Sequence, residues 1–291
     1  MLTNSKGQQI AAEEAVFPLL TFVDNTGFHC LGTGFFINEQ GGFLTAKHVF
    51  MEPNGEHVPR LYGVQSLPNG QRLVRELQYL DAHPNADIAH GSLGRVVNIN
   101  DNGGSNVPPL AQTLAISLDR LCVGDNVNTY GYPIQDIEDR HMQMVHITFQ
   151  GIPSNGHVLQ HCPEGSLRTR NECYETTLET QHGHSGGPVL KNGIVVGVNS
   201  SSAQGNTPSY FTPLQPFLLD LQASVDRIRC IINQALEYVM PISLAKSFVL
   251  KAEFLLVKTC HIPMNHRCRG ILLLENMVLL ITEKFRRQLL Q

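Results

Sequence analysis

The chain has 291 residues, of which 42% are hydrophobic and 16% are charged, and its net charge is −4. This composition supplies a buried core and argues against an intrinsically disordered chain. The slightly acidic balance, without a long basic run, also excludes nucleic acid as an expected partner.

The first part of the chain has short apolar runs separated by glycine-rich turns. This pattern is typical of antiparallel strands in a small barrel. We expect strands over residues 16–23, 28–37, 43–45, 73–80 and 88–93. Residues 98–109 are rich in Asn, Asp, Gly, Ser and Pro, which favours a linker. The sequence therefore predicts a first domain over residues 1–100.

A second β-rich block extends from about residue 114 to residue 202. The expected strands are residues 126–130, 142–150, 172–178, 188–190 and 194–199. Between the last two strands, Asn192 and Gly193 form an Asn-Gly pair, which is a strong signal for a tight hairpin turn. We predict a second domain over residues 101–222.

Beyond residue 217 the apolar pattern changes to helical spacing. The residues that recur every three or four positions are Val225, Ile228, Ile232, Leu236 and Val239. Further helical patterns cover residues 244–257 and 271–290. No apolar run reaches the roughly 20 residues that a membrane span requires. Residues 223–291 are therefore predicted to be a packed helical extension or an element for self-association, without membrane contact.

Cysteine usage and the N-terminus bear on location. The seven cysteines are an odd number at scattered positions, which favours reduced thiols. Residues 1–10 are polar and lack the pattern of a secretory signal. Both features predict a cytoplasmic protein, with export by a non-classical route as the alternative.

The clearest cluster of residue types that bind metal ions consists of Cys260 with His261 and His266 with Cys268. Their spacing matches none of the usual zinc patterns, which favour C-x₂₋₄-C and H-x₃₋₅-H pairs. We therefore expect neither a metal nor an organic cofactor.

Residues 183–188 read Gly-His-Ser-Gly-Gly-Pro and carry the main chemical signal. A serine hydroxyl becomes a good nucleophile only when a neighbouring base takes its proton. Glycines beside the serine allow a sharp turn and a close approach of the backbone to a substrate. Ser185 is therefore the candidate nucleophile of an acyl-transfer reaction.

A candidate base and a candidate carboxylate both lie upstream of Ser185. His48 follows Thr-Ala-Lys at residues 45–47, and Asp87 begins an Asp-Ile-Ala segment. The chain order is therefore His, Asp, Ser. A Gly-Thr-Gly-Phe segment at residues 32–35 precedes all three.

Together, these four segments resemble the trypsin-like (chymotrypsin-fold) serine proteases over roughly residues 14–222. The resemblance implies an all-β fold of two six-stranded antiparallel β-barrels, here followed by the C-terminal α-helical extension. It also implies a serine endopeptidase that binds its polypeptide substrate in an extended conformation.

The resemblance assigns a role to each site residue. His48 would act as general base and then general acid, and Asp87 would orient it, with Asp81 as the fallback. The backbone N–H groups of Gly183 and Ser185 would form the oxyanion hole.

The sequence is compatible with two specificities of the primary pocket. The resemblance places Glu179 at its base, where a carboxylate would favour Lys or Arg side chains, with Thr180 beside it. Thr180 and nearby histidines would instead suit an acidic side chain. Asn199, Ser201 and Ser202 would line another wall, and the backbone of Ser200 would pair with the substrate, while its side chain would support Asp87.

One departure from the digestive members of the family concerns activation. Those members pair a new N-terminus with an Asp just before the nucleophile, where this chain has His184. The chain therefore resembles the simpler members that are made without a propeptide.

Two other functions compete with this interpretation. The Gly-x-Ser-x-Gly pattern also fits the nucleophile elbow of α/β-hydrolases, which would make the protein an esterase. That fold, however, needs the order Ser, Asp, His. The second alternative is a catalytically inactive binding module of the protease fold, with its cleft occluded by residues 223–291.

Overall fold

The computed structural model describes residues 2–23, 27–51, 58, 60–97, 110–133, 149–203 and 206–217. Contacts divide the chain into two compact units, Met1–Gln215 and Pro216–Gln291. The predicted linker over residues 98–109, the predicted helical extension and the Cys/His cluster at residues 260–268 lie outside the described residues. No helix in the described part is long and apolar enough to span a membrane.

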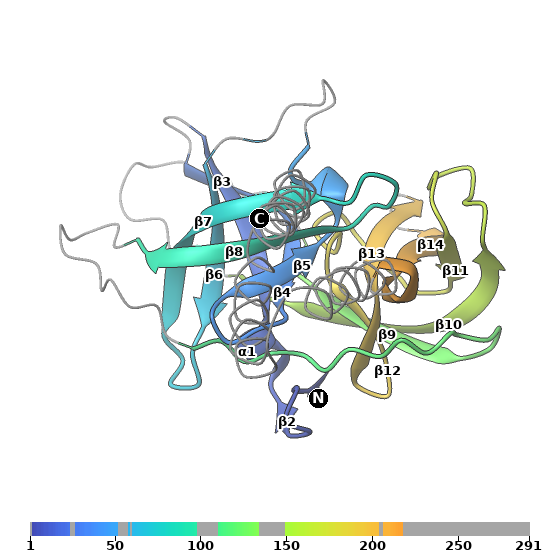
Figure 1. Cartoon of the computed structure of the whole chain (residues 1–291), viewed down its shortest axis with the longest axis horizontal. Coiled ribbons are helices and arrows are strands. Elements are labelled where there is room, and N and C mark those ends of the chain that lie inside the picture. The colour runs from blue at the N-terminus through green and yellow to red at the C-terminus, as the bar shows by residue number, and fades with distance from the viewer. Residues whose placement is uncertain are drawn as a thin grey trace, which may run out of the picture. The chain divides into compact units, whose positions relative to one another are not determined.

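The first six long strands close into one antiparallel barrel (Figure 1). Around the barrel the strands follow the order β3-β4-β5-β8-β7-β6. Their bounds are β3 Val16–Val23, β4 Gly27–Phe36, β5 Gly42–Thr45, β6 Leu61–Ser66, β7 Arg72–Ala82 and β8 Ala89–Val96.

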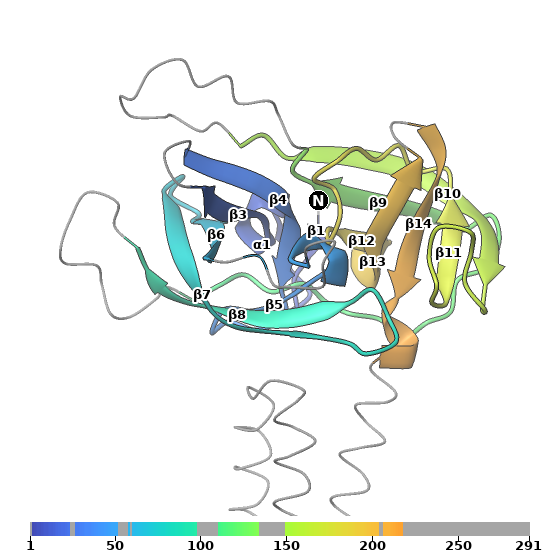
Figure 2. The same cartoon turned by 90° about the horizontal axis from the view of Figure 1, so that it is seen from above.

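The remaining six strands close into a second antiparallel barrel, which stands beside the first (Figure 2). Its strand order is β10-β11-β14-β13-β12-β9. The bounds are β9 Asn126–Gly131, β10 Ile152–Cys162, β11 Cys173–Thr176, β12 Pro188–Lys191, β13 Ile194–Ala203 and β14 Asn206–Pro213. The predicted fold of two six-stranded antiparallel barrels is confirmed.

One strand predicted for the second barrel is wrong over the residues of it that the structure describes. The prediction covered residues 142–150, of which residues 149–150 belong to no strand and residues 142–148 lie outside the described part. The strand instead begins at Ile152 and continues to Cys162. Among the strands of the two barrels, β6, β10 and β14 were not predicted.

The hairpin between β12 and β13 has the expected tight turn. Asn192 has a φ of 54° and Gly193 has a φ of 78°. Positive φ at both central residues defines a type I′ turn, whose twist matches that of the flanking strands. The Asn-Gly prediction is confirmed.

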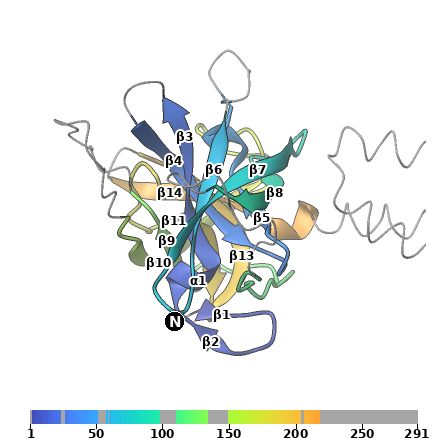
Figure 3. The same cartoon turned by 90° about the vertical axis from the view of Figure 1, so that its left-hand side faces the viewer.

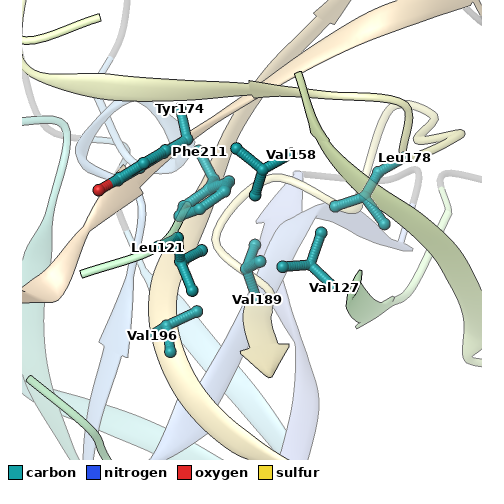
Figure 4. Close-up of a cluster of buried hydrophobic side chains, with 8 residues drawn as sticks. All are labelled: Leu121, Val127, Val158, Tyr174, Leu178, Val189, Val196 and Phe211. Carbon is teal, nitrogen blue, oxygen red and sulfur yellow. The ribbon is translucent and has the colours of Figure 1, made fainter. Parts of the chain in front are cut away.

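Each barrel has its own apolar centre. In the first, the ring of Phe17 lies 4.4 Å from that of Phe36 and 5.4 Å from that of Phe43, measured between centroids. In the second, eight buried side chains converge from the strands and from the segments before β9 and after β11 (Figure 4): Leu121, Val127, Val158, Tyr174, Leu178, Val189, Val196 and Phe211. Full burial of one such side chain stabilises a fold by about 1.5–3 kcal/mol.

The N-terminal segment packs along the base of both barrels. It forms a small hairpin of β1 (Leu2–Thr3) and β2 (Gln9–Ile10), followed by the one-turn helix α1 (Ala12–Ala15) (Figure 3). The backbone N–H of Thr3 donates to the Gly193 carbonyl at 3.1 Å. Tyr130 of β9 donates its hydroxyl to Glu13 at 2.6 Å. The segment is therefore bonded to the second barrel while its chain continues into β3 of the first.

Candidate active site

Strand pairing brings His48 and Asp87 to the same end of the first barrel. β5 pairs with β8 antiparallel, with Thr45 opposite Ala89. His48 lies in a short 3₁₀ turn, Lys47–Val49, directly after β5, and Asp87 lies directly before β8. Because the strands are antiparallel, the segment leaving β5 meets the segment entering β8. Buried Val49 anchors the turn, while the His48 side chain is 47% exposed.

Both oxygens of the Asp87 carboxylate bind His48. Oδ2 lies 2.8 Å from the ring Nδ1, and Oδ1 accepts the backbone N–H of His48 at 3.1 Å. A carboxylate with two partners on one residue fixes both the position and the ring orientation of that residue. Asp81, the fallback, is buried in β7 and pairs in register with His90.

The Asp87 contact also selects the histidine tautomer. An ionised carboxylate only accepts hydrogen bonds, so Nδ1 of His48 must carry the proton. In the neutral ring, Nε2 then holds a free lone pair. This is the arrangement that a general base needs.

The loop that carries Ser185 is held by β4 of the first barrel. Thr33 donates its backbone N–H to the Ser185 carbonyl at 2.8 Å and its hydroxyl to the Gly183 carbonyl at 2.6 Å. The same hydroxyl accepts the backbone N–H of Tyr132 at 3.0 Å. One threonine thus connects the first barrel to two segments of the second.

Gly32 explains how closely the two halves of the site approach. A Cβ added to Gly32 would lie 2.8 Å from the Ser185 carbonyl oxygen and 2.8 Å from a methyl of Val49. A side chain would therefore push apart the Ser185 loop and the turn that carries His48. Among the described residues, His48 forms no hydrogen bond with Ser185. Such catalytic hydrogen bonds are often long in the absence of substrate.

Two backbone donors are free on this loop. Among the described residues, the N–H groups of Gly183 and Ser185 have no hydrogen-bond acceptor. Gly183 has a φ of +97°, and His184 closes the turn over residues 181–184 by donating its N–H to the Gln181 carbonyl at 3.0 Å. A positive φ at the third residue is typical of a type II turn and favours glycine there.

His184 is buried beneath this turn, with only 1% of its surface exposed. Its Nδ1 accepts the backbone N–H of Gln181 at 3.3 Å. A Cβ added to Gly131 of β9 would lie within 2.7–3.0 Å of His184, so the ring packs directly on that strand. Burial lowers the pKa of His184.

The predicted substrate-binding residues lie in different environments. Glu179 is exposed, so it does not provide a buried carboxylate. Thr180 and Asn199 are 3% and 2% exposed, and Thr180 Oγ1 and Asn199 Oδ1 have no hydrogen-bond partner in the described part of the chain.

The three serines of β13 complete the predicted set. The Ser200 hydroxyl shares a 2.7 Å hydrogen bond with Thr212, and the hydrogen bonds of the described residues include none from it to Asp87. The side chains of Ser201 and Ser202 lie outside the described residues.

Thr33 was not singled out by the sequence analysis. The segment Gly-Thr-Gly-Phe drew attention to its glycines, but the residue that bonds the Ser185 loop stands between them. A polar residue flanked by two glycines in an apolar strand is the available signal. The described residues also contain no group of three or more His, Cys, Asp or Glu side chains arranged to hold a metal ion.

Comparison with known families decides the identity of the fold and its chemistry. Residues 32–198, which include all the residues of the proposed triad, match the family described as the trypsin-like peptidase domain. The chain belongs to this family. It is a serine-type peptidase by family, and the predicted family is confirmed.

Solved structures show the same fold at low sequence identity. The crystal structure of Deg5 is 18% identical, with a TM-score of 0.50, over 71% of this peptidase and 87% of the Deg5 chain. The MamO protease domain from Magnetospirillum magneticum, in its apo form, is 14% identical with a TM-score of 0.51, over 72% and 96% of the two chains.

A third structure is the HtrA-type protease AlgW with a tripeptide. It is 18% identical with a TM-score of 0.49, over 74% of this peptidase. The peptidase spans 62% of the length of the AlgW chain. A search of curated proteins gives no significant match to this peptidase.

Proposed function

We propose that the protein is a serine endopeptidase that cleaves polypeptides through an acyl-enzyme on Ser185. The observation that carries the proposal is the pairing of two features at one site. Asp87 holds His48 in the tautomer of a base, and Gly183 and Ser185 offer two N–H groups that no described residue accepts, on the loop of the nucleophile.

In the first step, Ser185 Oγ attacks the substrate carbonyl carbon and its proton passes to Nε2 of His48. The Asp87 carboxylate stabilises the imidazolium that forms, and it keeps the ring in place without taking the proton itself. The negative charge that develops on the carbonyl oxygen is stabilised by the N–H groups of Gly183 and Ser185.

Collapse of this intermediate expels the amine, to which His48 returns the proton. Water then attacks the acyl-enzyme with His48 again as base, and the second collapse regenerates the Ser185 hydroxyl. All steps use side chains and backbone groups of this chain and require no cofactor.

The open edge of β13 supports binding of an extended polypeptide. β12 pairs with β13 as far as Val198, and Asn199 bonds to the nucleophile loop through Gly186 and Gly187. Beyond Asn199, this edge has no strand partner among the described residues. A substrate strand can therefore add to the edge by main-chain hydrogen bonds.

Cleavage of a diverse peptide library by the full chain tests this function. Wild-type protein should cut internal bonds, and the Ser185→Ala variant should not. A folded wild-type protein that cuts no peptide would contradict the proposal and would favour the inactive binding module. A Ser185→Ala variant that retains cleavage would also contradict it.

A further inference from the structure

The nucleophile loop contains a buried histidine that the proposed mechanism does not use. His184 directly precedes Ser185, yet its ring points away from the reacting atoms and packs on Gly131 of β9. Its Nε2 atom has no hydrogen-bond partner within bonding distance in the described part of the chain. A buried polar atom without a partner lowers the stability of the fold, so an apolar side chain at this position would be less destabilising.

The contacts of His184 show what the ring does. Gln181 and His184 are joined by two hydrogen bonds in opposite directions. The His184 backbone N–H donates to the Gln181 carbonyl at 3.0 Å, and the Gln181 backbone N–H donates to the His184 ring at 3.3 Å. These bonds enclose residues 182–183, so they fix the peptide that presents the Gly183 N–H.

We propose that His184 is the positioning residue of the oxyanion hole, and that its neutral ring holds the turn over residues 181–184 in the productive conformation. The inference rests on the proposed function, since it concerns a donor of the same site. It explains how this peptidase orders its oxyanion hole without a pairing between a new N-terminus and an acidic residue before the nucleophile.

The hydrogen bond to Gln181 also fixes the ring's protonation state. A backbone N–H only donates, so Nδ1 must be unprotonated and the proton must lie on Nε2. A protonated ring has no acceptor left and would lose the bond. Burial in this position favours the neutral form.

The groups that face the ring do not counter this preference. β9 contributes Gly131, which has no titratable side chain, while Tyr130 beside it holds its hydroxyl on Glu13 of α1. β10 contributes the backbone of Ile152. The loop itself carries Glu179 and His182, both exposed. No charged side chain in the described residues is hydrogen-bonded to the His184 ring.

The test compares the rate of reaction with a fluorophosphonate probe in two variants of the full chain. His184→Leu introduces an apolar side chain of comparable size and removes the acceptor. His184→Asn keeps an acceptor oxygen near the position of Nδ1 and does not titrate. His157→Asn, which changes an exposed histidine of β10 outside the site, is the matched control.

The inference predicts a loss in the chemical step rather than in probe binding. His184→Leu should lower the maximal labelling rate at least about tenfold with little change in the apparent binding constant, because oxyanion donors act in the transition state. His184→Asn should stay within about threefold of wild type, and His157→Asn should not differ from it. A His184→Leu variant that labels as fast as wild type overturns the inference.

A second readout applies even if His184→Leu does not fold. The wild-type labelling rate should fall at acid pH more steeply than that of His184→Asn, because only the wild-type ring can lose its acceptor by protonation. Identical pH profiles overturn the inference.

Labelling of the wild-type protein at Ser185, which the Ser185→Ala variant should lose, keeps the two proposals separate. If the wild-type protein is folded but is not labelled at Ser185, the proposed function fails and the inference falls with it. If wild type is labelled at Ser185 and His184→Leu reacts equally fast, the proposed function stands and only the inference fails.

Discussion

Thr33 and Gly183 are joined across the two barrels by a hydrogen bond of 2.6 Å from the threonine hydroxyl to the glycine carbonyl. The bond holds the peptide that follows Gly183, and no described residue accepts the Gly183 N–H on the other side of this glycine. Since Thr33 also binds the Ser185 carbonyl through its backbone, β4 of the first barrel positions the catalytic loop of the second. The site is therefore a product of the contact between the barrels.

Replacing Thr33 with valine should damage both stability and activity. The change keeps the shape but leaves the Gly183 carbonyl and the Tyr132 N–H without their partner. We expect a loss of about 1–3 kcal/mol in the free energy of unfolding. A displaced Gly183 should lower kcat/KM on the order of 10²-fold. Urea unfolding and peptide hydrolysis measure the two effects, and Thr33→Ser, which keeps the hydroxyl, should resemble wild type.

Replacing Asp87 with asparagine should impair catalysis without unfolding the protein. An amide can donate a hydrogen bond to Nδ1 of His48, and this stabilises the tautomer whose Nε2 carries the proton. We expect kcat to fall on the order of 10⁴-fold with a small change in KM. Steady-state kinetics on a cleaved peptide measure this. A fall of only a few fold would show that Asp87 does not set the tautomer of His48.

The lowered pKa of His184 predicts a pH dependence of stability. The ordinary histidine pKa is 6.5, and the folded value lies below it because the ring is buried. Between these two values the unfolded chain binds more protons, so the free energy of unfolding rises with pH and levels off above 6.5. Urea unfolding of wild type and His184→Asn at several pH values measures this. The advantage of wild type should shrink as the pH falls below 6.5, whereas parallel curves would contradict the burial of a neutral ring.

Arg75 should be a major contributor to the stability of the first barrel. Its guanidinium is fully buried and donates to the Gln65 side chain and to the carbonyls of Gly94 and Leu93. Burial lowers its pKa to about 10, so it stays charged at neutral pH. Arg75→Met should cost about 2–4 kcal/mol in the free energy of unfolding, since it strands these acceptors.

The matched control for this prediction is Arg95, whose side chain is 71% exposed and pairs with Glu76 at 2.9 Å. Arg95→Met should change the free energy of unfolding by less than about 0.5 kcal/mol, because exposed ion pairs contribute little. Equal losses in the two variants, measured by urea unfolding, would show that the buried guanidinium has no special role.

The strands that sequence patterns predicted are those with dense apolar runs. β3 was predicted over residues 16–23 and has those bounds, because seven of its eight side chains are apolar and a turn-type sequence follows directly. β10 was missed because Pro153, Asn155 and Gly156 read as a turn, and few of its side chains are buried. Its strand structure comes from pairing with β9 and β11, which is a tertiary effect.

The candidate site likewise contains residues that a local motif identifies and residues whose role depends on distant contacts. The motifs around His48, Asp87 and Ser185 can be recognised in the sequence because each has a local context. Thr33 and Gln181 could not be predicted, because their roles depend on which distant backbone groups they meet. His184 was noted as a departure from a family pattern, but its burial against Gly131 required the packing of β9 against the loop.

The most direct test of the central claim is to map the adduct of a fluorophosphonate probe on the intact protein by mass spectrometry. The account predicts one adduct, on the peptide that carries Ser185, with labelling greatly slowed in His48→Ala and absent in Ser185→Ala. A folded wild-type protein without an adduct, or with an adduct on another residue, would contradict the claim that Ser185 is the activated nucleophile.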